Sequence, residues 1–388
     1  MTLGILIYPK TCNHIWISTM IKNFNNDVLN YDLEKYNFPK WALKRVRHKY
    51  PDVESLETIH CHVPVKELGS LQRYVSDGCE TPEFMEMLDD FLTENIKPLV
   101  DGKEFLIQRF GTLRVVIPDQ VKAGRILNYH QGIFVGNGTG LRTIWTPFTK
   151  CWGNNSMHML EYDESVEITK RCINEKWSQQ YLNDHCEDIS HHIQLDPGQS
   201  WLFNQELIHG NVNNDTGITR VSMDLRIMIK GENFGRKYPG QYFRIPYDWK
   251  LDRSKGKINN SESFISYVGW NSKYCKHLPM ILQRSFMDKY LKKHDITIND
   301  YHQENEYLDH LPNLQYLTNN IDNIIMLSIY CLPDNAEDRQ KIYETALANN
   351  CQLHFAQEDI IINSQDDIDL IEKYLTWGSS YLEWSLNV

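Results

Sequence analysis

Two histidines, far apart in the sequence, are the residues whose types could hold a reactive metal. His130 lies in the run Tyr129-His130-Gln131-Gly132, and His209 precedes Gly210 and Asn211. Mononuclear iron centres that use oxygen need two neutral imidazoles, usually one carboxylate, and open coordination positions. We therefore predict that His130 and His209 supply the imidazoles of such a centre.

The segment after His209 could bind a carboxylate. Residues 220–227 alternate strictly, so that Arg220, Ser222, Asp224 and Arg226 share one face of a predicted strand and apolar residues share the other. A guanidinium fork binds a carboxylate through two parallel hydrogen bonds, and a serine hydroxyl two residues on can add a third. This pattern favours a dicarboxylate such as 2-oxoglutarate. A purely structural ion pair of Arg220 with Asp215 or Asp224 is the alternative.

The surrounding segments predict an α+β protein of two parts. Residues 81–92 have a threonine cap, a proline in the first turn and apolar residues at helical spacing, which predicts an amphipathic helix. Lys, Gly, Asn and Ser gather at 252–261, which predicts a domain boundary near residues 255–262. We thus expect one domain at residues 1–255 and a second at 263–388.

The second part has an α/β rhythm, and parallel pairing of its strands is expected. Its predicted elements are strands at residues 264–268, 323–328 and 352–355 and helices at about 278–294, 334–349 and 366–374.

Residues of about 105–230 resemble the Fe(II)/2-oxoglutarate oxygenases of the phytanoyl-CoA hydroxylase-like superfamily, in particular the oxygenases of sporadic carbohydrate-biosynthesis clusters. The stretches that carry the likeness are residues 108–115, 130–132, 143–149, 153–157 and 209–226. The resemblance implies a double-stranded β-helix (jelly-roll, cupin-like) core with buttressing N-terminal helices. It also implies iron held by His130 and His209, and 2-oxoglutarate anchored by Arg220 with help from Ser222. The cofactors would be Fe(II), 2-oxoglutarate and O2.

Gly132 departs from the family pattern, which is His-x-Asp. Three explanations compete. A halide such as chloride fills the vacant position, as in halogenases of this superfamily; water or another carboxylate, such as Glu161 or Asp163, completes a hydroxylase; or the domain binds without catalysing. The expected function is therefore halogenation or hydroxylation of a C–H bond, with Gly132 part of the catalytic site, and the alternative is a non-catalytic scaffold. The family likeness implies a sugar or nucleotide-sugar substrate.

Residues 263–376 resemble a small family that also occurs in sporadic carbohydrate clusters. The likeness lies in residues 329–333, in Arg339 and Tyr343, and in residues 353–358. It implies a small three-layer α/β domain whose role is open. Arg339 and Glu358 are candidate contacts, although a structural salt bridge would explain either.

Composition limits the other functions. The chain has 388 residues, 41% of them hydrophobic, and a net charge of -11, which argues against a nucleic-acid partner. It has no apolar run of membrane-spanning length, and Met1–Lys10 lacks signal-peptide features, so a soluble cytoplasmic protein is expected, with a homo-oligomer open. The nine cysteines include no Cys-x-x-Cys, which favours reduced thiols.

Four other histidines are interpreted as structural. His60 and His62 fall on one face of a strand-like run at residues 58–63, and two ligands at that spacing are weak evidence for zinc. His191 and His192 would point to opposite faces of an extended segment. His158 is the better spare candidate, for which packing or substrate contact is favoured over metal binding.

Overall fold

The computed structural model describes residues 28–119, 128–233, 235, 237–250, 263–268, 280–298, 300–304 and 311–386. The N-terminal run Met1–Lys10 and the boundary expected at residues 255–262 lie outside these ranges. Contacts between residues divide the chain into two units. Unit 1 contains residues 1–72, 113–131 and 142–224, and unit 2 contains residues 73–112, 132–141 and 225–388.

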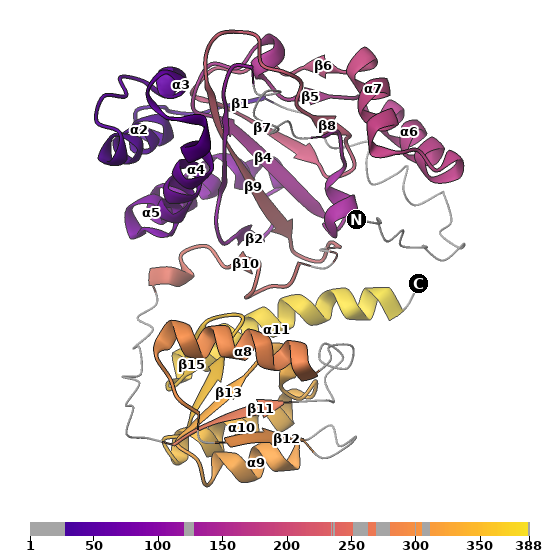
Figure 1. Cartoon of the computed structure of the whole chain (residues 1–388). Helices are drawn as coiled ribbons and strands as arrows, with labels where there is room; N and C mark the ends of the chain where they lie inside the picture. Colours follow the sequence, from indigo (N-terminus) through magenta and orange to yellow (C-terminus); the bar gives the residue numbers. More distant parts are fainter. Residues whose placement is uncertain are drawn as a thin grey trace. The chain divides into compact units, whose positions relative to one another are not determined.

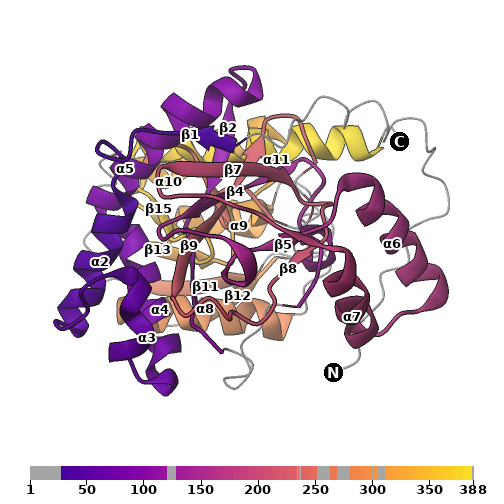
Figure 2. The same ribbon diagram turned by 90° about the horizontal axis from the view of Figure 1, so that it is seen from above.

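Unit 1 contains two sets of helices. The first set is α2 (Phe38–Lys49) and α3 (Ile59–His62), and the second is α6 (Tyr162–Glu175) and α7 (Gln179–Ile189). Figures 1 and 2 show the two sets on opposite sides of the strands of this unit.

The expected strand at residues 58–63 is wrong, because α3 occupies this segment. Leu56, Ile59 and Val63 are buried while His62 is exposed. This spacing of three and four residues is helical, and it outweighs the short local alternation.

Two antiparallel sheets are built mainly from strands of unit 1, whereas β2, β10 and the end of β9 belong to unit 2 by their residues. The larger sheet has the order β1-β7-β4-β9-β2-β10, with β3 beside β9, and the smaller one the order β6-β5-β8. The strands are β1 (Val28–Asn30), β2 (Phe105–Gln108), β3 (Thr112–Val116), β4 (Leu141–Pro147), β5 (His158–Met159), β6 (His191–His192), β7 (Gln199–Asn204), β8 (His209–Gly210), β9 (Arg220–Ile229) and β10 (Phe243–Arg244). The predicted strand at 220–227 is confirmed as part of β9.

A hydrophobic cluster joins the two sheets within unit 1. It contains Trp145 of β4, Phe203 of β7 and Met159 of β5, together with Cys151, Met157, Leu195, Trp201 and Leu207. Since its members come from both sheets, the inner faces of the sheets pack on a shared core. The observed architecture is therefore a mixture of helices and antiparallel sheets.

In unit 2, α4 (Leu68–Asp77) continues from unit 1, and α5 (Pro82–Phe91) confirms the predicted helix at 81–92. Asp89 of α5 is fully buried and accepts two hydrogen bonds from Arg244 of β10, at 2.5 and 2.8 Å. The backbone N–H of Tyr247 and the indole N–H of Trp249 donate to the same carboxylate. This network fixes the segment after β10 against α5.

The C-terminal part of unit 2 contains a sheet of order β12-β11-β13-β14-β15, parallel except for β15. The bounds are β11 (Phe264–Val268), β12 (Asp300–Gln303), β13 (Asn323–Met326), β14 (Gln352–Phe355) and β15 (Ile360–Ile362). The helices are α8 (Met280–His294), α9 (Pro312–Thr318), α10 (Ala336–Ala348) and α11 (Gln365–Leu386). The three predicted strands and three helices are all present, and α11 extends well beyond residue 374. β12 and β15 were not expected.

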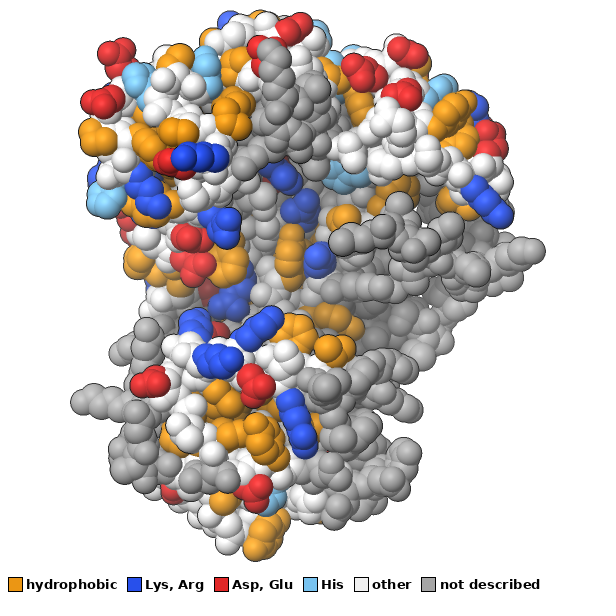
Figure 3. All heavy atoms as spheres, in the orientation of Figure 1, with side chains coloured by type: hydrophobic (Ala, Val, Ile, Leu, Met, Phe, Trp, Pro, Cys, Tyr) orange, Lys and Arg blue, Asp and Glu red, His pale blue; other side chains and the backbone are white. Residues whose placement is uncertain are grey.

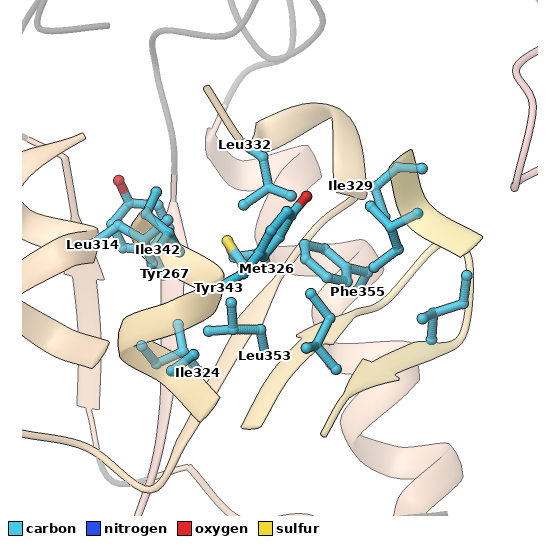
Figure 4. Close-up of a cluster of buried hydrophobic side chains, with 14 of the residues drawn as sticks. Tyr267, Leu314, Ile324, Met326, Ile329, Leu332, Ile342, Tyr343, Leu353 and Phe355 are labelled. Atoms are coloured by element: carbon cyan, nitrogen blue, oxygen red, sulfur yellow. The ribbon is translucent and has the colours of Figure 1, made fainter. Parts of the chain in front are cut away.

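Side-chain alternation explains why helices cover both faces of this sheet. Phe264 and Val268 pack with α8, whereas Ile265 and Tyr267 join a larger cluster with α9, α10 and α11. Figure 4 shows part of the larger cluster. Because helices cover both faces of the sheet, side chains on both faces of each strand are buried. The sequences of these strands are therefore nearly continuous runs of apolar residues.

Candidate metal centre

His130 and His209 are brought together by a two-residue antiparallel bridge. The N–H of His130 donates to the carbonyl of His209 at 2.9 Å, and the N–H of His209 donates to the carbonyl of His130 at 3.0 Å. Residues directly opposite in such a bridge project their side chains to the same face. The ring centroids are accordingly only 4.4 Å apart.

The backbone also sets the tautomer of both rings. Nδ1 of His130 lies 2.8 Å from the carbonyl oxygen of Asn128, and Nδ1 of His209 lies 2.8 Å from that of Leu207. A carbonyl only accepts hydrogen bonds, so each neutral ring carries its proton on Nδ1 and its lone pair on Nε2. Such a hydrogen bond on the second nitrogen is the usual outer support of a metal-binding histidine.

Packing holds the histidine pair in place from two sides. The ring of Phe203 meets that of His209 edge to face, with the centroids 5.2 Å apart. Tyr129, beside His130, packs closely over Gly210: a Cβ at Gly210 would lie 2.9 Å from Tyr129 Cγ and 3.0 Å from its backbone N and Cα. Glycine is required here by this close approach, which keeps the bridge in register.

Gly132 is buried and begins a short 3-10 turn, Gly132–Val135. Among the described residues, no third His, Cys, Asp or Glu joins the histidine pair to form a group able to hold a metal. Glu161 is 66% exposed and lies 3.4 Å from His191 at the start of α6, and Asp163 lies in the first turn of that helix. The described residues thus place neither alternative carboxylate in the group.

Arg220 is a buried cation that lacks a carboxylate partner among the described residues. Its Nη1 donates to the carbonyl of Asn155 at 3.0 Å, and its guanidinium lies 5.8 Å from the centre of the Trp145 ring. Its Nε has no hydrogen-bond partner within the described part of the chain. Burial lowers the pKa of this guanidinium. The hydroxyl of Ser222, two residues along the same face, is also buried without a described partner.

Both aspartates that could have paired with Arg220 are engaged elsewhere. Asp224 accepts a hydrogen bond from Arg114 at 2.8 Å, and Asp215 accepts one from Asn154 at 3.0 Å. A buried, unpaired charge costs several kcal/mol unless it meets a counter-ion. The arrangement therefore fits an anionic ligand at Arg220 and Ser222.

Arg220 and the histidine pair border the same hydrophobic cluster. Arg220 lies over Trp145, and His209 packs on Phe203, and both aromatic residues belong to the core between the two sheets. An apolar surround excludes water and strengthens charge interactions. The two imidazoles with Nε2 lone pairs suit a divalent iron ion, and the buried guanidinium at the border of the same cluster suits a carboxylate co-substrate.

His158 has a different environment. It is 8% exposed, its Nδ1 lies 3.5 Å from Ser190 Oγ, and its Nε2 has no described partner. Burial lowers its pKa. Tyr129 shares the Ser190 hydroxyl at 2.6 Å, so His158 belongs to a hydrogen-bond network with neutral hydroxyls, and it joins no metal-binding group among the described residues.

The two C-terminal candidates have internal partners. Arg339 pairs with Glu372 through two hydrogen bonds of 2.7 Å. Glu358 is fully buried and accepts hydrogen bonds from the Ser328 hydroxyl at 2.6 Å and the Ile329 N–H at 3.2 Å. Burial raises its pKa to about 7. The expected structural salt bridge is therefore present at Arg339, whereas Glu358 is held by neutral hydrogen-bond donors and forms no ion pair within the described residues.

The supporting residues of the site were not expected from the sequence. Tyr129, Phe203, Trp145 and Asn155 act through tertiary contacts, which no local pattern reveals. For Gly210, its place directly after His209 is the signal that the sequence offers.

Comparison with known proteins gives one relative and several distant likenesses. No family model matches the chain. Over 122 residues the chain is 29% identical to the streptomycin biosynthesis protein StrG of Streptomyces griseus, a match that covers 31% of this chain and 46% of that protein. The chain thus spans about half the length of this relative.

Among solved structures, HygX from Streptomyces hygroscopicus with nickel and 2-oxoglutarate bound has 13% identity and a TM-score of 0.33, over 52% of this chain and 81% of that one. EctD from S. alaskensis in its apoform has 15% identity and a TM-score of 0.30, over 57% and 80%. The nickel complex of the non-heme monooxygenase ThoJ has 13% identity and a TM-score of 0.29, over 52% and 71%. With TM-scores this low, we base no conclusion on these likenesses.

None of the helices in the described residues combines the length and apolar composition that a membrane crossing needs.

Proposed function

We propose that this chain is an Fe(II)- and 2-oxoglutarate-dependent enzyme with a double-stranded β-helix core, which oxidises a C–H bond of a small molecule. The observation that supports it best is the pairing of His130 with His209, whose backbone hydrogen bonds leave a lone pair on each Nε2. The buried guanidinium of Arg220 is the second support, because it calls for an anion.

Under this proposal His130 and His209 hold the iron, and Arg220 and Ser222 bind a carboxylate of 2-oxoglutarate. Iron, 2-oxoglutarate and O2 would supply the oxidising power to break an unactivated C–H bond when bound. The protein's own residues position these groups. Phe203 packs against the ring of His209, Trp145 lies against the Arg220 guanidinium, and the Asn155 carbonyl orients that guanidinium.

Gly132 bears on which reaction follows. A glycine leaves room for a small exogenous ligand where a carboxylate side chain would otherwise bind. A halide there would make the enzyme a halogenase, and water would leave it a hydroxylase. We propose halogenation and hydroxylation as the two candidate reactions of this site. The dependence of the charge-transfer band on chloride distinguishes them.

For the substrate we propose a sugar or nucleotide-sugar precursor. The support is the family likeness of residues 105–230, together with a relative whose name places it in streptomycin biosynthesis.

The test is anaerobic titration of the purified chain with Fe(II) and 2-oxoglutarate, followed by measurement of succinate after oxygen is admitted. The visible charge-transfer band and succinate should appear, and His130→Ala and His209→Ala should each abolish both. His192→Ala is the matched control, since His192 is an exposed histidine of the same unit. A protein that gives no band and no succinate would instead be a binding or scaffold protein.

A further inference from the structure

Unit 2 contains a cavity of about 700 Å³ that the proposed oxidation does not use. This volume lies within the range of small-molecule sites. The residues that line it come from the segments around α5 and β2, from the end of β9, from the turn after β10 and from α11: Thr93, Lys97, Lys103, Glu104, Phe105, Lys230, Ile245, Pro246, Tyr247, Asp369, Glu372, Lys373, Thr376 and Trp377.

The charges that line the cavity favour an anion. It has four lysines, namely Lys97, Lys103, Lys230 and Lys373, in a chain whose net charge is -11. Of its three carboxylates, Glu104 pairs with Lys230, Glu372 is bound by Arg339, and Asp369 accepts a hydrogen bond from the Gln365 side chain at 2.9 Å. Lys97 and Lys373 have no carboxylate within ion-pair distance among the described residues. Their ammonium groups can therefore bind a ligand without breaking an internal pair.

Aromatic side chains supply the other half of the lining. Trp377 of α11 is partly buried, and Lys230 lies 5.5 Å from the centre of its ring. Tyr247 also lines the cavity, and its backbone has the left-handed φ of 61°, which a bulky residue rarely adopts. The buried carboxylate of Asp89 holds this conformation by accepting the Tyr247 N–H at 2.7 Å. Such a strained residue persists only where its surroundings fix it.

We propose that this cavity binds a nucleoside diphosphate group. Aromatic rings suit the flat face of a nucleobase, and lysines suit phosphate oxygens. The group could come as a free nucleotide or as part of a nucleotide-activated sugar. This site is independent of the iron site, so either can fail without the other.

The test is calorimetric titration of the full chain, without added metal, with UDP, ADP, UDP-glucose and inorganic pyrophosphate. At least one nucleotide should bind saturably, and more tightly than pyrophosphate. Lys97→Ala combined with Lys373→Ala should weaken binding at least tenfold, and Trp377→Leu should weaken the nucleotides but not pyrophosphate. If UDP-glucose binds more tightly than UDP, the ligand is a nucleotide-activated sugar. If it binds equally or more weakly, the ligand is a free nucleotide.

Lys292→Ala is the matched control, since Lys292 is an exposed lysine of α8 in the same unit, outside the cavity. Figure 3 shows other basic side chains over this helix, so a nonspecific charge effect would respond to the control. The proposal is overturned if no nucleotide binds at millimolar concentration, if pyrophosphate binds as tightly as the nucleotides, or if the lysine pair can be removed without loss. Thermal unfolding of each variant checks that the fold is retained.

Discussion

His130 and His209 exchange two backbone hydrogen bonds and hold their ring centroids 4.4 Å apart, with the ring planes tilted by 50°, although 78 residues separate them in the sequence. The bridge places both side chains on one face, and each Nδ1 is tied to a carbonyl two residues earlier. The geometry of the pair is thus a property of the backbone. Changes that shift the backbone should therefore damage the site as much as loss of an imidazole.

Gly210→Ala tests this dependence on the backbone. The added Cβ would lie about 3 Å from the backbone of Tyr129, so Tyr129 and His130 must move. We expect Fe(II) affinity to fall at least tenfold, in line with the loss of outer-shell support at other metal sites. The measurement is equilibrium Fe(II) binding. Gly217→Ala is the comparison, because it strains the backbone at a glycine with φ of 75° but places no Cβ against a neighbouring atom. Unchanged Fe(II) affinity in Gly210→Ala would argue against a metal site at this bridge.

Arg220→Lys should weaken 2-oxoglutarate binding about tenfold or more, because an ammonium cannot make the parallel pair of hydrogen bonds that a guanidinium makes. Ser222→Ala should have a smaller effect, of roughly a few fold. The dissociation constant of 2-oxoglutarate measured with Fe(II) under anaerobic conditions checks both. Arg171→Lys, on the exposed side of α6, is the control. Equal affinities in all three variants would show that Arg220 does not bind the co-substrate.

Gly132→Asp separates the two reactions. If a halide fills the position beside Gly132, a carboxylate there should abolish any effect of chloride on the charge-transfer band and leave oxidation intact. If water fills it, the band should ignore chloride in both proteins. The measurement is the band position in 0 to 100 mM chloride, about the range in which weak halide binding becomes visible. A chloride response that survives in Gly132→Asp would rule out a halide at this position.

Glu358 should make stability depend on pH. Its pKa is raised by burial from 4.5 to about 7 in the folded protein, so the unfolded chain loses its proton first as pH rises. The free energy of unfolding should therefore fall between pH 4.5 and 7, by roughly 3 kcal/mol from this group. Glu358→Gln should remove this contribution. Urea denaturation at pH 5 and pH 7.5 compares the two proteins, and an equal pH dependence in both would contradict the assignment.

Asp89→Asn should destabilise the fold by about 3–5 kcal/mol, because it breaks a buried two-bond ion pair and leaves Arg244 with only the more distant carboxylate of Asp248, 3.9 Å away. The same change should release Tyr247 from its left-handed backbone and weaken nucleotide binding in the cavity. Urea denaturation gives the first quantity and calorimetry the second. Glu86 lies on the same helix as Asp89 and forms an exposed ion pair with Lys250. Glu86→Gln is therefore the control, and it should change neither the free energy of unfolding nor nucleotide binding.

Local patterns in the sequence were sufficient for the elements with the clearest periodicity and end signals. The alternation of residues 220–227 predicts β9, and the cap and spacing at 81–92 predict α5, because each depends on neighbours at fixed spacing. The C-terminal strands and helices follow from the same rules. The wrong strand prediction at residues 58–63 has the same origin. Over six residues, alternation and helical spacing are hard to distinguish, and the burial of Leu56, Ile59 and Val63 favours the helix.

The types and order of residues in the sequence were enough to name the candidate site residues. They did not show how these residues are arranged in space. The bridge between His130 and His209 and the burial of Arg220, which has no carboxylate partner within the described residues, both require segments that are distant in sequence to meet. The same holds for Arg339 and Glu358, whose partners lie on other elements. Burial and long-range hydrogen bonds depend on the whole packed chain, so these features appear only once it is folded.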